Sequence, residues 1–283
     1  MKKHLFILLL ALISLPRLSA QYTQLPQGDT LRVLAIGNSF SVDATAYLQE
    51  IAAAAGKPMI IGNLFIPGCS IETHFENSLN DDQPYIYYKN IAGHKTEQHF
   101  SLAQGIKDES WDVITFQQAS PLSGQYESFF PELAELMEFV KDSVSNPRVR
   151  FMWHMTWAYA QNSDHEGFAQ YAHSQMKMHQ LIELAAYRVK ESAHFSSIIP
   201  VGTAIYNCRN SKIGDHVTRD GYHLNEIGRY AAACTWFEVL FGESALDITW
   251  HPEHISKKQA SICKNAARYA VKYTTQKLEA VKY

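Results

Sequence analysis

The 283-residue sequence carries 25 Lys and Arg against 28 Asp and Glu, so its formal net charge is −3. This acidic balance argues against a nucleic-acid partner, which would require a basic face. A chain of this length can bury a full hydrophobic core as one large domain.

The first 20 residues have the pattern of an export signal. Lys2 and Lys3 precede an apolar run over residues 5–13, which is too short for a stable membrane anchor, and residues 18–20 (Leu-Ser-Ala) offer a cleavage site. No Cys follows that site, which disfavours a lipoprotein. Cleavage would leave 263 residues with 22 basic and 28 acidic side chains, a net charge of −6. We therefore expect a periplasmic or secreted protein with no membrane anchor after cleavage.

Short apolar strands alternate with amphipathic helices in the rest of the chain. Strands are predicted at residues 33–37, 58–65, 112–116, 149–155 and 197–201. Helices are predicted from Ser41 or Asp43, as the cap, to Gly56, and over residues 129–144, 166–190 and 225–241. Continuous apolar strands separated by helices indicate a parallel sheet covered on both faces. The predicted fold is α/β: a three-layer α/β/α sandwich with a parallel sheet of about five strands.

Two segments are less regular. Residues 74–105 hold several Tyr and many polar residues, and we expect a cap or loop over the site. Residues 246–283 begin with Trp250 and continue into a mixed-charge helix from about Ser256, which predicts a helical extension of a core at about residues 30–245. Without repeats or a low-complexity linker, residues 21–283 are expected to form a single domain.

Three predicted strands are followed by residues that suit ester chemistry. Because the carboxyl ends of parallel strands share one edge, Ser39, Gly68 and Gln117 should converge there. Ser39 occupies a strand-to-helix turn, where it could act as a nucleophile and its N–H could contact an oxyanion. Gly68 offers a second N–H, and a side-chain amide of Gln117, or alternatively Gln118, a third donor. The alternative for each residue is an ordinary turn, cap or packing role.

An Asp-x-x-His sequence near residue 220 could supply the base. Asp220 lies three residues before His223, so its carboxylate can reach Nδ1 of the imidazole and leave Nε2 free to take a serine proton. Asp215 and His216 are the local competitors. Ser39, Asp220 and His223 thus form the predicted catalytic set.

Other motifs for chemistry are weak or missing. The sequence has no G-x-S-x-G, Walker, G-x-G-x-x-G or H-E-x-x-H motif. Cys69, Cys208, Cys234 and Cys263 form no C-x-x-C pair, and either disulfides or buried free thiols fit their spacing. The group His251, Glu253 and His254 lacks further ligands at suitable spacing, so we expect no metal and no organic cofactor.

The ordered set of blocks resembles the SGNH (GDSL-like) hydrolases, and more closely the DUF4886 branch of mostly bacterial exported proteins. The resemblance covers residues 30–245 and rests on four blocks: Ile-Gly-Asn-Ser-Phe-Ser at 36–41, Pro-Gly-Cys-Ser-Ile-Glu at 67–72, Trp-Asp-Val-Ile-Thr-Phe-Gln-Gln-Ala-Ser at 111–120, and Arg-Asp-Gly-Tyr-His-Leu at 219–224. The chain departs from the common pattern at Asn38, where Asp is usual, and in the third block, where Gln replaces Gly-x-Asn.

The resemblance implies a flavodoxin-like fold and an exported serine esterase acting on an acylated small molecule or glycan. Removal of acetyl or other acyl groups from a carbohydrate is the expected activity, with Ser39, Gly68 and Gln117 (or Gln118) as the oxyanion hole. Abundant aromatic residues, including Trp153, Trp157, Tyr159 and Tyr85–Tyr88, suit either sugar stacking or the core. The alternatives are a non-catalytic glycan-binding protein and a lipase or thioesterase. The sequence does not identify the acyl group or the glycan.

Overall fold

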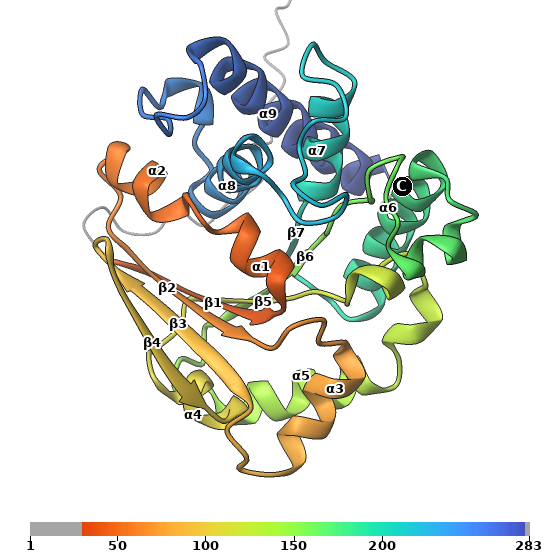
Figure 1. Cartoon of the computed structure of the whole chain (residues 1–283). Helices are drawn as coiled ribbons and strands as arrows, with labels where there is room; N and C mark the ends of the chain where they lie inside the picture. The colour runs from red at the N-terminus through yellow and green to blue at the C-terminus, as the bar shows by residue number, and fades with distance from the viewer. Residues whose placement is uncertain (1–29, 281–283) are drawn as a thin grey trace, which may run out of the picture.

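The computed structural model describes residues 30–280, with a seven-stranded sheet between two helical layers (Figure 1). The export signal predicted at residues 1–20 lies outside the described residues. The strands are β1 (Leu31–Gly37), β2 (Met59–Phe65), β3 (Tyr85–Ile91), β4 (His94–Phe100), β5 (Val113–Phe116), β6 (Arg150–His154) and β7 (Ser197–Ile199).

The strand order β4-β3-β2-β1-β5-β6-β7 joins two kinds of pairing. Strands β2, β1, β5, β6 and β7 are parallel neighbours, which confirms the predicted parallel core. Strands β3 and β4 form an antiparallel hairpin that adds to the β2 edge. The sheet therefore has seven strands instead of about five, and the cap or loop predicted over residues 74–105 is wrong for this hairpin.

Nine α-helices lie within the described residues: α1 (Ser39–Ala44), α2 (Leu48–Ala54), α3 (Ile71–Glu76), α4 (Leu102–Lys107), α5 (Glu132–Ser143), α6 (Gln175–Ser192), α7 (Val201–Arg209), α8 (Glu226–Phe241) and α9 (Lys257–Ala280). In Figure 1, α1, α2, α7, α8 and α9 cover one side of the sheet, and α3, α4 and α5 cover the other. Helix α9, predicted from about Ser256, packs against α7 and α8.

Short 3₁₀ helices complete the connections: η1 (Asn77–Leu79), η2 (Ser120–Leu122), η3 (Tyr126–Phe129), η4 (Glu166–Tyr171) and η5 (Ala245–Asp247). The helix predicted over 166–190 is therefore split. Its first part is η4, and α6 begins only after Ser174, whose side chain accepts a hydrogen bond from the Lys177 N–H. Ser174 acts as the helix N-cap by satisfying one of the unpaired N–H groups of the first turn.

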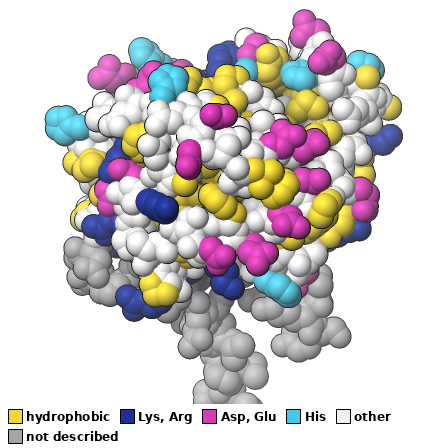
Figure 2. Space-filling view, turned by 90° about the horizontal axis from the view of Figure 1, so that it is seen from below, with side chains coloured by type: hydrophobic (Ala, Val, Ile, Leu, Met, Phe, Trp, Pro, Cys, Tyr) yellow, Lys and Arg dark blue, Asp and Glu magenta, His cyan; other side chains and the backbone are white. Residues whose placement is uncertain are grey.

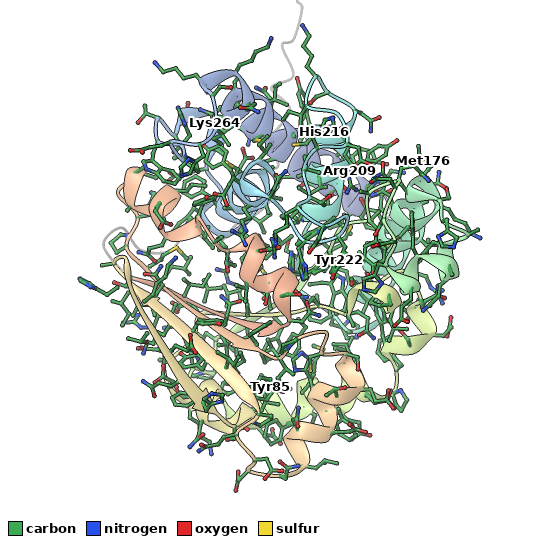
Figure 3. All side chains as sticks on the ribbon, in the orientation of Figure 1. Tyr85, Met176, Arg209, His216, Tyr222 and Lys264 are labelled. Atoms are coloured by element: carbon green, nitrogen blue, oxygen red, sulfur yellow. The ribbon has the colours of Figure 1, made fainter. Side chains whose placement is uncertain are left out.

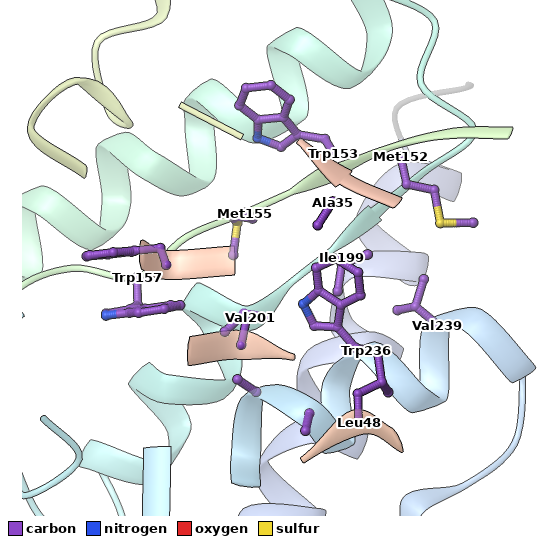
Figure 4. Packing of buried hydrophobic residues seen from close by; sticks show 14 of the residues in the cluster. Ala35, Leu48, Met152, Trp153, Met155, Trp157, Ile199, Val201, Trp236 and Val239 are labelled. Carbon is purple, nitrogen blue, oxygen red and sulfur yellow. The ribbon is translucent and has the colours of Figure 1, made fainter. Parts of the chain in front are cut away.

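The hydrophobic core lies on both faces of the parallel strands. Successive residues of a strand point to opposite faces, so in β6 Trp153 packs on Phe195 while His154 contacts Trp236 of α8. Figure 4 shows Trp153 and Trp236 on either side of the strands, with Ile199 beside Trp236. The two-sided burial explains why these strands read as continuous apolar runs.

The surface beneath the sheet carries mixed side chains. Figure 2 shows acidic groups spread among apolar and neutral ones on this face, without a continuous basic patch. Among residues 30–280, no helix combines the length and the apolar character needed to cross a membrane.

Candidate active site

Ser39, His223 and Asp220 lie within hydrogen-bonding distance of one another. Ser39 is the first residue of α1 and is separated from the end of β1 only by Asn38, and its Oγ lies 2.8 Å from His223 Nε2. His223 Nδ1 lies 2.6 Å from Asp220 Oδ2. Since a carboxylate can only accept, Nδ1 carries the ring proton and Nε2 is free to accept the Ser39 hydroxyl proton. This is the arrangement of a nucleophile, a base and an orienting acid.

Asp220 is held as a carboxylate by three donors. Its partial burial opposes ionisation, but hydrogen bonds from the His223 ring and from the backbone N–H groups of His223 and Tyr222 outweigh burial and lower its pKa. The backbone donors lie 2.7 and 3.1 Å from Asp220 Oδ1. The carboxylate therefore stays charged and fixes both the tautomer and the orientation of His223.

The turn that carries His223 is fixed by its neighbours. Gly221 has φ +88°, and a Cβ there would approach Ser163 to about 3.0 Å, so the position requires glycine. Trp157 Nε1 donates to the Tyr222 carbonyl at 2.7 Å, and the Trp157 ring stacks on Phe40 at 4.2 Å. Because Phe40 follows Ser39, one buried indole supports both the base and the nucleophile.

Asp43 ties the nucleophile helix to the His223 turn. Its buried carboxylate accepts hydrogen bonds from Arg219 Nη1 (2.9 Å), Arg229 Nη2 (2.8 Å) and the Leu224 N–H (2.8 Å). Asp43 was predicted only as a possible helix cap, and its pairing with Arg219 was missed. A signal existed, since Asp43 lies one helical turn after Ser39 and Arg219 lies directly before Asp220.

Asn38 is the N-cap of α1 in place of the predicted Ser41 or Asp43. Its Oδ1 accepts from the Phe40 N–H at 3.0 Å and its Nδ2 donates to the Cys69 carbonyl at 3.0 Å. Ser41 Oγ instead donates back to the Asn38 carbonyl at 2.8 Å. The amide at position 38 thus joins the Ser39 turn to the loop that contains Gly68, which a carboxylate could not do because it has no donor.

The predicted role of Gln117 as an oxyanion donor is wrong. Its Nε2 donates to Asn38 Oδ1 at 2.8 Å, and its Oε1 accepts from His154 Nδ1 at 2.7 Å. Gln117 is 1% exposed and lies beneath the Ser39 turn instead of facing the space beside Ser39 Oγ. Both polar atoms of the Gln117 amide therefore have partners inside the protein, and the bond from Nε2 fixes the orientation of the Asn38 side chain.

Gln118, the alternative donor, is occupied as well. Its Nε2 donates to the Ser128 carbonyl at 2.9 Å, and its Oε1 accepts from the Ile71 and Ala119 N–H groups. Neither glutamine lines the cavity at Ser39. A side chain adjacent to a strand end can point into the loops as readily as toward the site, and the sequence alone does not distinguish these orientations.

Two backbone N–H groups of the cavity lining have no acceptor within the described protein. Among residues 30–280, no protein group accepts a hydrogen bond from the N–H of Ser39 or of Gly68. Gly68 lines the same cavity as Ser39, and its φ of +66° is a left-handed conformation that glycine adopts without strain. Both groups can therefore donate to an oxygen atom in the cavity.

A cavity of about 690 Å³ opens in front of Ser39. Its lining mixes polar and apolar groups: Asn38, Ser39, Phe40, Phe65, Pro67, Gly68, Ser70, Ala119, Ser120, Pro121, Leu122, His165, Arg219, Tyr222 and His223. His165 was missed by the sequence analysis. Its only sequence signal is its place in a polar loop after β6, at the same sheet edge as Ser39.

Several other candidates lie outside the site. Asp215 pairs with Arg209 at 2.7 Å and accepts from the Gln161 N–H at 2.8 Å, and Figure 3 places His216 well away from Tyr222. The large aromatics Trp153, Trp157 and Tyr159 are buried, so they belong to the core and cannot stack on a ligand.

The four cysteines are buried free thiols. Burial raises the pKa of Cys69 to about 12, which keeps this neighbour of Gly68 protonated and unreactive. Within the part of the chain that the structure describes, no group of three or more His, Cys, Asp or Glu is arranged to hold a metal ion.

Comparisons with known proteins match the chain to a family model and to solved structures. Residues 32–270 match the family described as a domain of unknown function, DUF4886. A crystal structure of a DUF4886 family protein from Bacteroides uniformis is 46% identical, with a TM-score of 0.84 over 87% of this chain and 96% of that one. A protein from Parabacteroides merdae whose description proposes a GDSL-like lipase shares the fold at 12% identity, with a TM-score of 0.51 over 75% of this chain and 96% of that one. No protein with a curated description matches.

Proposed function

The chain belongs to the DUF4886 family, and from the geometry of its site we propose that it is a serine ester hydrolase. The observation that carries this proposal is the continuous set of hydrogen bonds from Ser39 through His223 to Asp220, at 2.8 and 2.6 Å. A turn or cap serine has no need of a base 184 residues downstream that is itself oriented by a carboxylate.

The proposed reaction has two halves. Ser39 Oγ attacks the ester carbonyl carbon while His223 Nε2 takes the hydroxyl proton, and the carbonyl π electrons move to the oxygen. Collapse of this intermediate breaks the bond to the alcohol, which leaves with the proton from His223, and an acyl group remains on Ser39. In the second half, His223 Nε2 takes a proton from water as the water oxygen attacks the acyl carbon. The bond between the acyl carbon and Ser39 Oγ then breaks, Oγ takes the proton from His223, and the acid leaves.

The developing negative charge falls on the carbonyl oxygen. In this proposal the Ser39 and Gly68 N–H groups donate to that oxygen, and the position of Ser39 at the first residue of α1 directs its N–H outward. A buried chain of hydrogen bonds runs from His154 through Gln117 to Asn38 and on to the Cys69 carbonyl. It holds the Ser39 turn and the Gly68 loop at a fixed separation. Asn38, Gln117 and His154 act as positioning residues.

We place the substrate among short-chain acyl esters of carbohydrates, with acetyl as the acyl group tested first. The cavity of about 690 Å³ has room for a sugar ring, and its lining combines hydroxyl, imidazole and guanidinium groups with apolar side chains that include Phe40, Phe65 and Leu122. A lipase or long-chain thioesterase would need a long apolar groove instead. The predicted export signal fits a substrate outside the cytoplasm.

A screen of hydrolysis rates tests this function. The purified protein should cleave p-nitrophenyl acetate and acetylated glycosides faster than long-chain p-nitrophenyl esters. Ser39→Ala should lower turnover by several orders of magnitude, because members of a triad act as a unit, whereas Ser41→Ala should cost far less. Wild-type turnover in a folded Ser39→Ala variant, or a preference for long acyl chains, would contradict the proposal.

One observation favours a second candidate, a non-catalytic glycan-binding protein. The third oxyanion donor expected from the third block is absent, because Gln117 and Gln118 are both occupied elsewhere. The same screen separates the candidates. Calorimetric binding of acetylated glycosides with no release of acetate by the wild type would support the second one.

A further inference from the structure

His165 presents a fixed N–H donor to the cavity beside the proposed base. It is the N-cap of η4, and its Nδ1 accepts from the Gly167 N–H at 3.0 Å. A neutral imidazole has one donor and one acceptor nitrogen, so this cap places the ring proton on Nε2. Burial is the largest effect on the pKa of His165 and lowers it. The nearby Glu166 carboxylate raises this pKa and His223 lowers it, and the net shift is downward, which favours the neutral form.

The surroundings of His165 direct its ring toward the site. The ring packs edge-on to Tyr222 at 4.7 Å, and Tyr222 lies 4.4 Å from the ring of His223. Tyr159, buried beneath, contacts the His165 ring at 4.6 Å. His165 lines the same cavity as Ser39, and no group among residues 30–280 accepts a hydrogen bond from its Nε2. Its donor is therefore free for a ligand.

The order of the strands indicates which part of an ester would meet this donor. Gly68 follows β2, on one side of β1, and His165 follows β6, on the other side. The carbonyl oxygen belongs at the Gly68 side, where the two backbone donors are. The departing alcohol must lie next to His223, because His223 Nε2 returns the proton to it. His165, which reaches the cavity beside Tyr222 and His223, therefore faces the alcohol part.

We propose that His165 is a specificity residue whose Nε2–H donates a hydrogen bond to an oxygen atom of the alcohol part, next to the ester bond. This inference rests on the proposed function and deepens it. The substrates selected are esters of polyols such as sugars, in which a neighbouring hydroxyl or ring oxygen can accept that bond. An ester of a simple alcohol or phenol has no such oxygen and gains nothing from His165.

The test compares two acetate esters that differ only in the alcohol: a mono-acetylated methyl glycoside and p-nitrophenyl acetate. The measured quantity is the ratio of their kcat/KM values in the wild type and in His165→Asn. Asn is a good N-cap, so its Oδ1 keeps an acceptor for the Gly167 N–H, while its Nδ2 donors lie closer to the backbone than the imidazole Nε2 and do not reach the same point of the cavity. We expect the ratio to fall about tenfold, the effect of one lost neutral hydrogen bond.

A binding measurement gives a readout that does not depend on turnover. In the Ser39→Ala background, which holds the uncleaved ester, His165→Asn should weaken calorimetric binding of the acetylated glycoside by a similar factor. Thermal unfolding of each variant serves as the check on the fold.

The outcomes separate the two inferences. If His165→Asn leaves the ratio of the two kcat/KM values unchanged, whether or not both values fall, His165 only supports Tyr222 and the turn. That result would overturn the specificity role but not the proposed esterase activity. Failure of the wild type to cleave either ester would overturn the proposed function and the role of His165 with it.

Discussion

The sharpest prediction concerns Asp43, which joins the helix that starts at Ser39 to the turn that holds His223. Asp43→Asn keeps the size of the side chain but removes its charge and one acceptor oxygen. The carboxylate is 2% exposed and accepts hydrogen bonds from Arg219, Arg229 and the Leu224 N–H. The substitution leaves both guanidinium groups without their shared counter-ion, so stability and active-site geometry should change together.

The expected loss of stability follows from burial. Removing one partner of a buried ion pair costs about 3–5 kcal/mol. The side chains of Arg219 and Arg229 are 42% and 29% exposed, so they can hydrate and the loss should fall to about 2–3 kcal/mol, between the values for exposed and buried pairs. Small displacements of a catalytic group can lower rates about 10²-fold, and we expect a loss of kcat of that order.

Glu238 offers a matched control away from the site. Its carboxylate is 1% exposed, pairs with the half-exposed Arg268 at 3.3 Å and accepts from the Ala245 N–H at 2.9 Å. Glu238→Gln should lower the free energy of unfolding, measured in urea, and leave kcat for p-nitrophenyl acetate near the wild-type value. If Asp43→Asn were no more harmful to kcat than Glu238→Gln at equal folded fraction, the positioning role of Asp43 would be refuted.

Three further predictions test the site and its support. His223→Ala should lower kcat/KM for p-nitrophenyl acetate by several orders of magnitude, because members of a triad act as a unit; near-wild-type turnover in a folded variant would argue against His223. Asn38→Asp should lower the unfolding free energy by about 1–3 kcal/mol, because a carboxylate oxygen would replace the donor to the Cys69 carbonyl; an unchanged urea midpoint would contradict this. Burial lowers the pKa of His74 and of His154 to about 3. Below the unfolded-state pKa of about 6.5, the unfolded chain therefore binds protons at these two residues that the folded chain does not bind. As the pH falls from 6.5 toward 3, each histidine should lower the free energy of unfolding by up to about 1.4 kcal/mol per pH unit. Urea titrations at pH 7.5 and 5.5 measure this slope, and a slope that His74→Gln leaves unchanged would count against the assignment.

Local features of the sequence were enough to predict that Ser39, Asp220 and His223 come together. A parallel strand buried on both faces must be apolar throughout, so β1 and β5 could be recognised as continuous runs. The turn after such a strand lies at the carboxyl edge of the sheet, which placed Ser39. Asp220 and His223 are three residues apart, so their pairing depends only on one turn of backbone.

The hairpin could not be predicted in the same way. Strand β4 (His94–Phe100) is exposed along almost its whole length at the edge of the sheet. A strand without a buried face has no alternation of apolar and polar residues, so periodicity carries no signal. Its pairing with β3 is set by backbone hydrogen bonds, which any sequence of suitable propensity can make.

The tertiary structure alone decided which polar groups face the cavity and which hold it together. Gln117 and Gln118 are adjacent in sequence, yet one binds Asn38 and the other binds Ser128, because each amide turns toward the unpaired polar groups that folding brings within reach. Asp43 meets Arg219 across 176 positions of sequence. A buried carboxylate is stable only when it is paired with a cation or hydrogen-bonded. Which arginine pairs with Asp43 depends on the folded arrangement of distant segments and cannot be read from the sequence.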